Sequence, residues 1–126
     1  MKKRITTQEA PAAVGPYSQA IAVGNTVYLS GQIGLDPATG KLVEGGVVEQ
    51  TRQCLKNIQG ILNAIHAGPE AVVKTTVYLA HIEDFARVNA VYGEFFTGDA
   101  PARSCVAVQA LPLGSLVEIE ALVVLS

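Results

Sequence analysis

The chain has 126 residues, a formal net charge of −2 at pH 7 with neutral histidines, 49% hydrophobic residues and only 16% charged residues. This length suits one domain, spanning residues 1–126, that builds its core without a disulfide or metal. The slightly negative charge provides no basic field for nucleic acid, and no run approaches the ~20 apolar residues of a membrane helix. Because so few residues are charged, we expect some apolar surface to lie between subunits.

The cysteines and the N-terminal segment indicate the class of protein. Cys54 and Cys105 are too few for a disulfide framework, and neither is spaced with His66 or His81 as in a zinc motif. The N-terminal "MKKR" is a short basic cluster that we expect to be a solvated end, and no apolar signal segment follows it. We therefore expect a cytoplasmic protein without a metal site.

The first half of the chain changes from a strand pattern to a helix pattern. Residues 18–33, "SQAIAVGNTVYLSGQI", predict two strands joined by a tight turn at "VGN". "DPATGK", residues 36–41, predicts a second, irregular hairpin. Apolar residues then recur at helical spacing over 47–67, and Gly68-Pro69 is predicted to end this helix.

The second half alternates strand, helix and two strands. Residues 71–80, "AVVKTTVYLA", predict a strand, 83–96 a helix, and "PARSCVAV" and "SLVEIEALVV" two closing strands that belong in the core. The order β-β-β-α-β-α-β-β predicts an α+β domain with a six-stranded mixed sheet, whose right-handed crossovers place both helices on one face. The other face must be polar or covered by another chain.

Charged residues stand at the starts of the two closing strands. If these strands pair antiparallel with matched apolar rows, the charged residues and one cysteine face away from the helices; these residues are Arg103, Cys105, Glu118 and Glu120. They could form a solvated cross-strand ion pair, which contributes only a few tenths of a kcal/mol. Alternatively, a partner covers this face, so that the guanidinium binds a carboxylate while a glutamate handles a proton or a water.

Six segments resemble the signature blocks of the RidA family, also called YjgF, the reactive-intermediate (imine) deaminases: "APAAVGPYSQA", "YLSGQIG", "VKTTVYL", "DFARVNAVY", "PARSCVAV" and "LVEIEA". They occur in the family's order and cover essentially the whole chain. The resemblance implies a chorismate-mutase-like fold and a homotrimer, with a site in each cleft between neighbouring subunits. It also implies hydrolysis of short 2-imino acids, such as 2-iminobutanoate and 2-iminopropanoate formed from enamines such as 2-aminoacrylate, to 2-keto acids and ammonia. No metal or organic cofactor is implied.

The resemblance assigns the two central roles of the site. Arg103, in "PARS", matches the arginine that binds the substrate carboxylate, for which a planar double donor is better suited than lysine. Glu118, first of the pair in "VEIE", matches the glutamate that positions the attacking water. Glu120 is then expected to be a solvated or interface neighbour, although only the motif position favours Glu118 over it.

Four further residues match family positions, namely Tyr17, Ser30, Gly31 and Asn89, and Cys105 stands at a cleft position where relatives often carry another small residue. The missing side chain of Gly31 would let a backbone N–H approach the carboxylate. Tyr17 could equally be an interface aromatic, and Asn89 could hold a loop rather than touch substrate. Cys105 is expected to be a wall residue rather than a thiolate nucleophile, because such chemistry usually needs a neighbouring base.

The sequence leaves two other functions open. The family's other reported roles are RNA cleavage and inhibition of translation, for which this sequence lacks a basic stripe, an exposed aromatic platform and a histidine pair. A non-catalytic, metabolite-binding or chaperone-like trimer would hold a carboxylate ligand without turnover.

Overall fold

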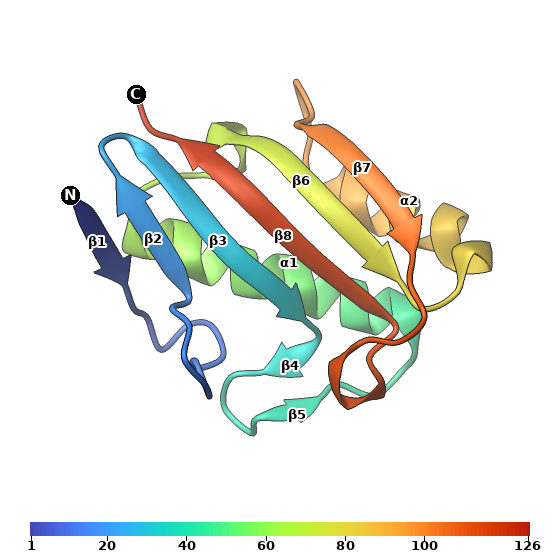
Figure 1. Ribbon diagram of the computed structural model, residues 1–126. Coiled ribbons are helices and arrows are strands. Elements are labelled where there is room, and N and C mark those ends of the chain that lie inside the picture. Colours follow the sequence, from blue (N-terminus) through green and yellow to red (C-terminus); the bar gives the residue numbers. More distant parts are fainter.

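The structure, a computed structural model, describes residues 1–126 and consists of a six-stranded sheet with two helices on one face (Figure 1). The sheet has the order β1-β2-β3-β8-β6-β7, and only the β6–β7 pair is parallel. Its strands are β1 (Lys2–Ile5), β2 (Ala20–Val23), β3 (Thr26–Ile33), β6 (Val72–Leu79), β7 (Ala102–Ala107) and β8 (Val117–Val124). The helices are α1 (Val47–Ala64) and α2 (Phe85–Phe95). The predicted α+β fold with a six-stranded mixed sheet and two helices is therefore confirmed.

The N-terminal segment differs from the expectation of a solvated tail. Its residues form the edge strand β1, which pairs antiparallel with β2 and leaves most of its side chains exposed. The "DPATGK" hairpin forms as predicted, but its strands β4 (Leu35–Asp36) and β5 (Lys41–Leu42) make a separate small sheet. The sixth strand of the main sheet is thus β1.

The long helix α1 ends three residues earlier than predicted. His66 adopts a left-handed conformation with φ 55°, and the amide of Ala67 donates to the Leu62 carbonyl at 3.0 Å. This backbone bond satisfies a carbonyl at the helix end, as in the Schellman motif. The conformation of His66, rather than Gly68-Pro69, therefore ends the helix.

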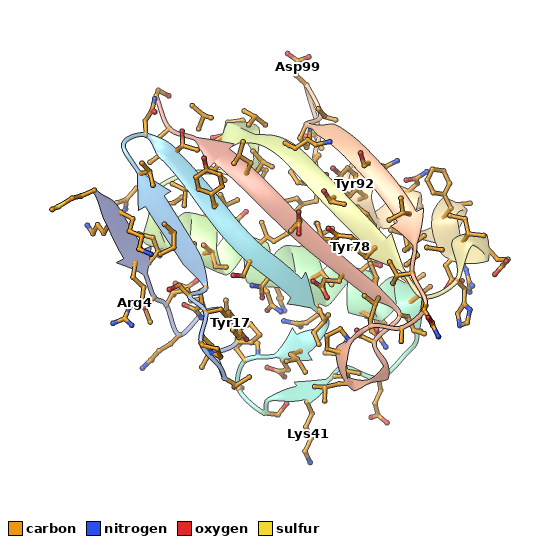
Figure 2. All side chains as sticks on the ribbon, viewed as in Figure 1. Arg4, Tyr17, Lys41, Tyr78, Tyr92 and Asp99 are labelled. Carbon is orange, nitrogen blue, oxygen red and sulfur yellow. The ribbon has the colours of Figure 1, made fainter.

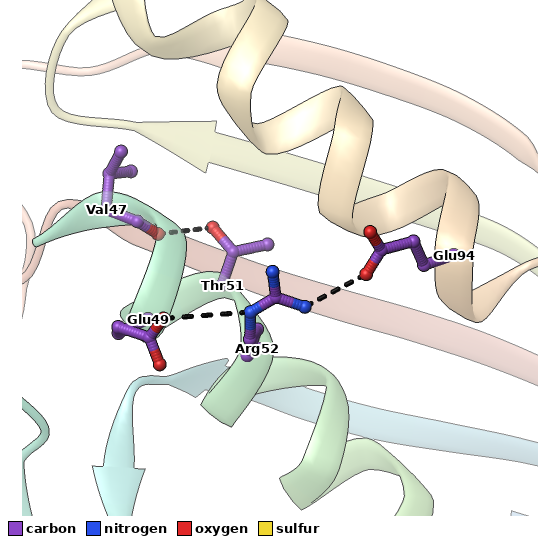
Figure 3. Close-up of polar contacts among 5 residues, drawn as sticks. All are labelled: Val47, Glu49, Thr51, Arg52 and Glu94. Atoms are coloured by element: carbon purple, nitrogen blue, oxygen red, sulfur yellow. Dashed lines mark hydrogen bonds and ion pairs between the residues drawn. The ribbon is translucent and has the colours of Figure 1, made fainter. Parts of the chain in front are cut away.

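The two helices pack side by side behind the sheet, and polar contacts link them at the surface. Arg52 of α1 donates to Glu94 of α2 at 2.9 Å and lies 3.7 Å from Glu49 (Figure 3). Such exposed pairs contribute little, so the contact depends mainly on the buried apolar residues between sheet and helices. Neither helix combines the length and the apolar composition that a membrane crossing requires.

The two closing strands are not neighbours, because β6 lies between β7 and β8. In the register of β6, Thr75 pairs with Arg103, whereas Tyr78 pairs with Glu118. Thr75 lies under the helices, and only 1% of its surface is exposed. Arg103 is paired with Thr75 and therefore also faces the helices. Side chains alternate along a strand, so Tyr78 points the other way, and its partner Glu118 lies on the open face.

The predicted common face for the charged residues is therefore wrong. Arg103 and Cys105 lie on the helix-covered face of β7, and Glu118 and Glu120 lie on the opposite face of β8. The prediction assumed that β7 and β8 pair directly, whereas their relation is set by two separate registers with β6. Val106, expected in the core, is accordingly 45% exposed on the open face.

Candidate functional site

Glu118 lies in a cavity at the end of the open sheet face. The cavity has a volume of about 540 Å³, and its polar lining includes Tyr17, Ser30 and Glu118. Apolar residues form much of the remaining wall, including Pro11, Ile33, Pro112 and Leu113. Burial raises the pKa of the half-buried Glu118 carboxyl, and the nearby Glu120 carboxylate raises it further. This carboxyl is therefore suited to exchange a proton closer to neutral pH than an ordinary glutamate.

Gly31, also at this cavity, is required by the position of Glu118. A β-carbon built on Gly31 would lie 2.9 Å from Cδ of Glu118 and would overlap its carboxylate oxygen. Any larger residue would therefore displace the Glu118 side chain. The expectation for Gly31 concerned a substrate carboxylate and stays a prediction; the structure shows that the missing side chain makes room for the Glu118 carboxylate.

The wall of the cavity near Tyr17 is held by Gln19, a residue that was not among the predicted site residues. The Gln19 side chain is only 4% exposed; it accepts from the Thr7 amide at 2.7 Å and donates to the Pro11 carbonyl at 2.8 Å. Ser30 in turn donates from Oγ to the Ser18 carbonyl at 2.5 Å. These bonds fix the loop over residues 6–19 against β3. The only sequence signal for this loop-holding role was a glutamine directly before an apolar strand.

Arg103 lies in a different environment, against α2. Its guanidinium donates to Oδ1 of Asn89 at 2.7 Å. The guanidinium carbon lies 4.8 Å from the ring centroid of Tyr92 and 5.5 Å from that of Phe85. Asn89 thus neither holds a loop nor lines the Glu118 cavity, but binds the arginine.

No carboxylate of the chain neutralises Arg103. The ion pairs of the structure involve Arg52 and Arg87, so the cross-strand Arg–Glu pair considered above does not form. A half-buried guanidinium without an acidic partner is an unusual arrangement, because buried charges are normally paired. This environment is suited to a carboxylate from outside the chain.

Neither cysteine is an activated thiol. Cys105 is half-buried and packs against the core beside Arg103, and burial raises its pKa although the guanidinium acts in the opposite direction. Cys54 is completely buried in α1, which also raises its pKa. Because the thiolate is the nucleophilic form, both shifts disfavour covalent catalysis by cysteine.

The expected site residues thus form two groups within one chain. The first, around the cavity, comprises Tyr17, Ser30, Gly31 and Glu118; the second, against α2, comprises Arg103, Asn89 and Cys105. The strands β7 and β8 are separated by β6, which implies about 10 Å between them in addition to the opposite faces. In Figure 2, Tyr17 of the first group lies beside the loop near β2, whereas Tyr92, which contacts Arg103, lies beside β6 and β7. A single chain does not bring the two groups together.

Comparisons with known proteins agree with this architecture. The family model described as endoribonuclease L-PSP matches residues 7–125. A mouse protein named 2-iminobutanoate/2-iminopropanoate deaminase is 55% identical over 124 residues, which cover 98% of this chain and 92% of that protein. A crystal structure from Thermotoga maritima is similar with a TM-score of 0.97 and 47% identity, covering 100% of this chain and 99% of the other. RidA from an Antarctic Psychrobacter gives a TM-score of 0.94 and 46% identity, covering 98% of this chain and 99% of that one. Because the family model and these alignments cover nearly the whole chain, the chain belongs to the endoribonuclease L-PSP family, also known as the RidA (YjgF) family.

Proposed function

We propose that this protein hydrolyses short 2-imino acids to 2-keto acids and ammonia, at sites formed where two copies of the chain meet. The observation that carries the proposal is the division of the site between an arginine without an acidic partner and a half-buried glutamate on the other face of the sheet. The deaminase name of the mouse relative supports the choice of reaction.

Arg103 binds the substrate carboxylate. A guanidinium has five N–H donors, and the only hydrogen bond that Arg103 makes through its side chain is to Asn89. The remaining donors can bind both oxygens of a carboxylate in parallel, a geometry that lysine cannot reproduce. This contact fixes the imine carbon relative to the rest of the site.

Glu118 acts as the base that activates water. The water attacks the carbon of the protonated imine and transfers a proton to the Glu118 carboxylate, and the product is a neutral carbinolamine. Glu118 then gives this proton to the amino nitrogen. As the C–N bond breaks, the carbinolamine hydroxyl loses its proton to the Glu118 carboxylate and becomes the carbonyl of the 2-keto acid, and ammonia is released. No covalent intermediate is required, because an imine carbon is already electrophilic.

A homotrimer would unite the two groups. The open face, which holds Glu118 and Glu120, also carries exposed apolar residues along its length, among them Val23, Tyr28, Val106 and Val124. An uncovered sheet face of this composition is suited to burial against other copies of the chain. We propose that Arg103 and α2 of one subunit face the Glu118 cavity of its neighbour.

Mixing two inactive variants tests both the reaction and the shared site. A threonine dehydratase supplies 2-iminobutanoate, and release of 2-ketobutanoate is followed with and without the protein. Arg103→Ala and Glu118→Gln should each abolish the acceleration. When the two variants are unfolded and refolded together, about one site in four should receive both intact residues from different chains.

Recovery of roughly that fraction of activity supports a site between subunits. If the mixture stays inactive although mixed oligomers form, the shared site is refuted. Binding of 2-ketobutanoate without acceleration by the unmodified protein would instead favour a metabolite-binding trimer. RNA cleavage is disfavoured because Glu118 and Glu120 would repel a phosphate backbone, and RNA cleavage without imine hydrolysis would overturn the proposal.

A further inference from the structure

We propose that Phe85 and Tyr92 of α2 are positioning residues, which hold the Arg103 guanidinium in place while leaving its donors free for the substrate carboxylate. This inference rests on the proposed function of Arg103. It concerns two residues that would not touch substrate and that act only through the arginine.

Both aromatic rings lie within the range of a cation–π interaction. The guanidinium carbon is 4.8 Å from the Tyr92 centroid and 5.5 Å from the Phe85 centroid, below the limit of about 6 Å. Phe85 and Tyr92 are seven residues apart and therefore lie on the same side of α2, two turns apart, with Asn89 between them. The hydrogen bond from Arg103 to Asn89 and its two ring contacts are thus all made by one face of the helix α2.

The Tyr92 ring is itself anchored to the sheet. Its hydroxyl is hydrogen-bonded to Oγ1 of Thr75 at 2.6 Å, and the ring is only 6% exposed. Thr75 is the residue of β6 that pairs with Arg103 in β7. The ring is therefore fixed relative to the backbone position from which the arginine side chain extends.

The chemistry of this support differs from that of an ion pair. A carboxylate partner would occupy the N–H groups that the substrate needs, and it would compete with the substrate carboxylate for the positive charge. An aromatic face attracts the cation without accepting those hydrogen bonds. Burial raises the pKa of the Tyr92 hydroxyl, so the ring stays neutral and does not become such a competitor.

Binding of 2-ketobutanoate, measured by calorimetry or by NMR titration, tests the inference without depending on turnover. Tyr92→Leu should weaken binding by about 3- to 30-fold, as expected for loss of a partly desolvated cation–π contact. Tyr92→Phe retains the ring and should keep most of the affinity. Phe95→Leu is the matched control, because it removes an aromatic ring of α2 that is not in contact with the guanidinium.

A mutant cycle separates positioning from a general structural role. In an Arg103→Ala background, Tyr92→Leu should have no further effect on the weak residual affinity, because the group through which it acts is missing. In kinetics, KM should rise more than kcat falls. If the same loss occurs with and without Arg103, or if Tyr92→Leu binds as tightly as the unmodified protein, the inference is overturned.

Two further outcomes are distinguished by the design. Phe85 is 40% exposed, so Phe85→Leu should leave the core intact. If Tyr92→Leu fails to fold, the same binding measurement is made with Phe85→Leu. In that case, Phe85→Leu that binds 2-ketobutanoate as tightly as the Phe95→Leu control would refute the inference. If Arg103→Ala alone binds 2-ketobutanoate normally, the proposed role of Arg103 is refuted instead.

Discussion

The carboxylate of Glu118 lies directly over the α-carbon of Gly31, in the space that a side chain at position 31 would occupy. The two residues belong to the adjacent strands β3 and β8, which show a register shift between Leu29 and Gln32. The local irregularity of β3 and the absence of a side chain together create room for the glutamate at the end of the sheet.

Gly31→Ala is therefore expected to displace Glu118 and to lower the deaminase rate by at least about tenfold, because a misplaced base loses its alignment with the water. The overall fold should persist, since the flexible end of a side chain can move. Gly93→Ala in α2 is the control, as its β-carbon would meet nothing within 4 Å. Circular dichroism and the coupled assay check the two variants, and normal activity of Gly31→Ala would contradict the assigned position of the base.

Glu120 is expected to tune the pH dependence through Glu118. The base is active when deprotonated, so activity should fall as pH decreases through the raised pKa of Glu118. Glu120→Gln removes the negative charge that raises this pKa, although burial remains, so the acid limb of the pH–rate profile should move to lower pH. Initial rates across pH 4–8 measure the shift, at about half-unit intervals. The exposed Glu44→Gln serves as control, and a limb that stays in place would show that Glu120 does not act on the base.

Arg103→Lys should keep the fold and the oligomer but lose most of the activity. A lysine retains the charge but supplies a point donor in place of the planar double donor, and it cannot reproduce the geometry beside Asn89. We expect a loss on the order of 10- to 100-fold in kcat/KM, since a bidentate contact is replaced by a single one. Sedimentation confirms the assembly, and near-normal turnover by this variant would refute carboxylate binding by Arg103.

His66→Gly should stabilise the protein by roughly 0.5–1 kcal/mol, because glycine adopts a left-handed conformation without the steric cost that histidine incurs at φ 55°. His81→Gly is the matched control, since His81 has an extended conformation with φ −136° and gains nothing from glycine. Urea unfolding at one fixed protein concentration compares the two variants with the unmodified chain. A destabilised His66→Gly would show that the imidazole makes a compensating contact.

Much of the fold could be predicted from local sequence patterns. The tight turn after β2, the apolar stripe of α1, the β-branched run of β6 and the helix α2 were all predicted, and the structure contains them. The strand formed by "MKKRI" was missed, because an edge strand with exposed side chains has no apolar alternation to reveal it. The end of α1 was misplaced because histidine in a left-handed conformation leaves no signal comparable to glycine.

The sequence by itself determined which residues are candidates for the chemistry, because the segments that hold Arg103, Glu118 and Gly31 each resemble a block of the family. Only the tertiary structure decided where they point. Arg103 and Glu118 lie on opposite faces because β6 is inserted between their strands, and a one-residue change in either register would have reversed the result. The face of the sheet that a side chain occupies, and the strand beside it, depend on pairings between segments far apart in the chain. Local periodicity shows only which side chains of one strand share a face.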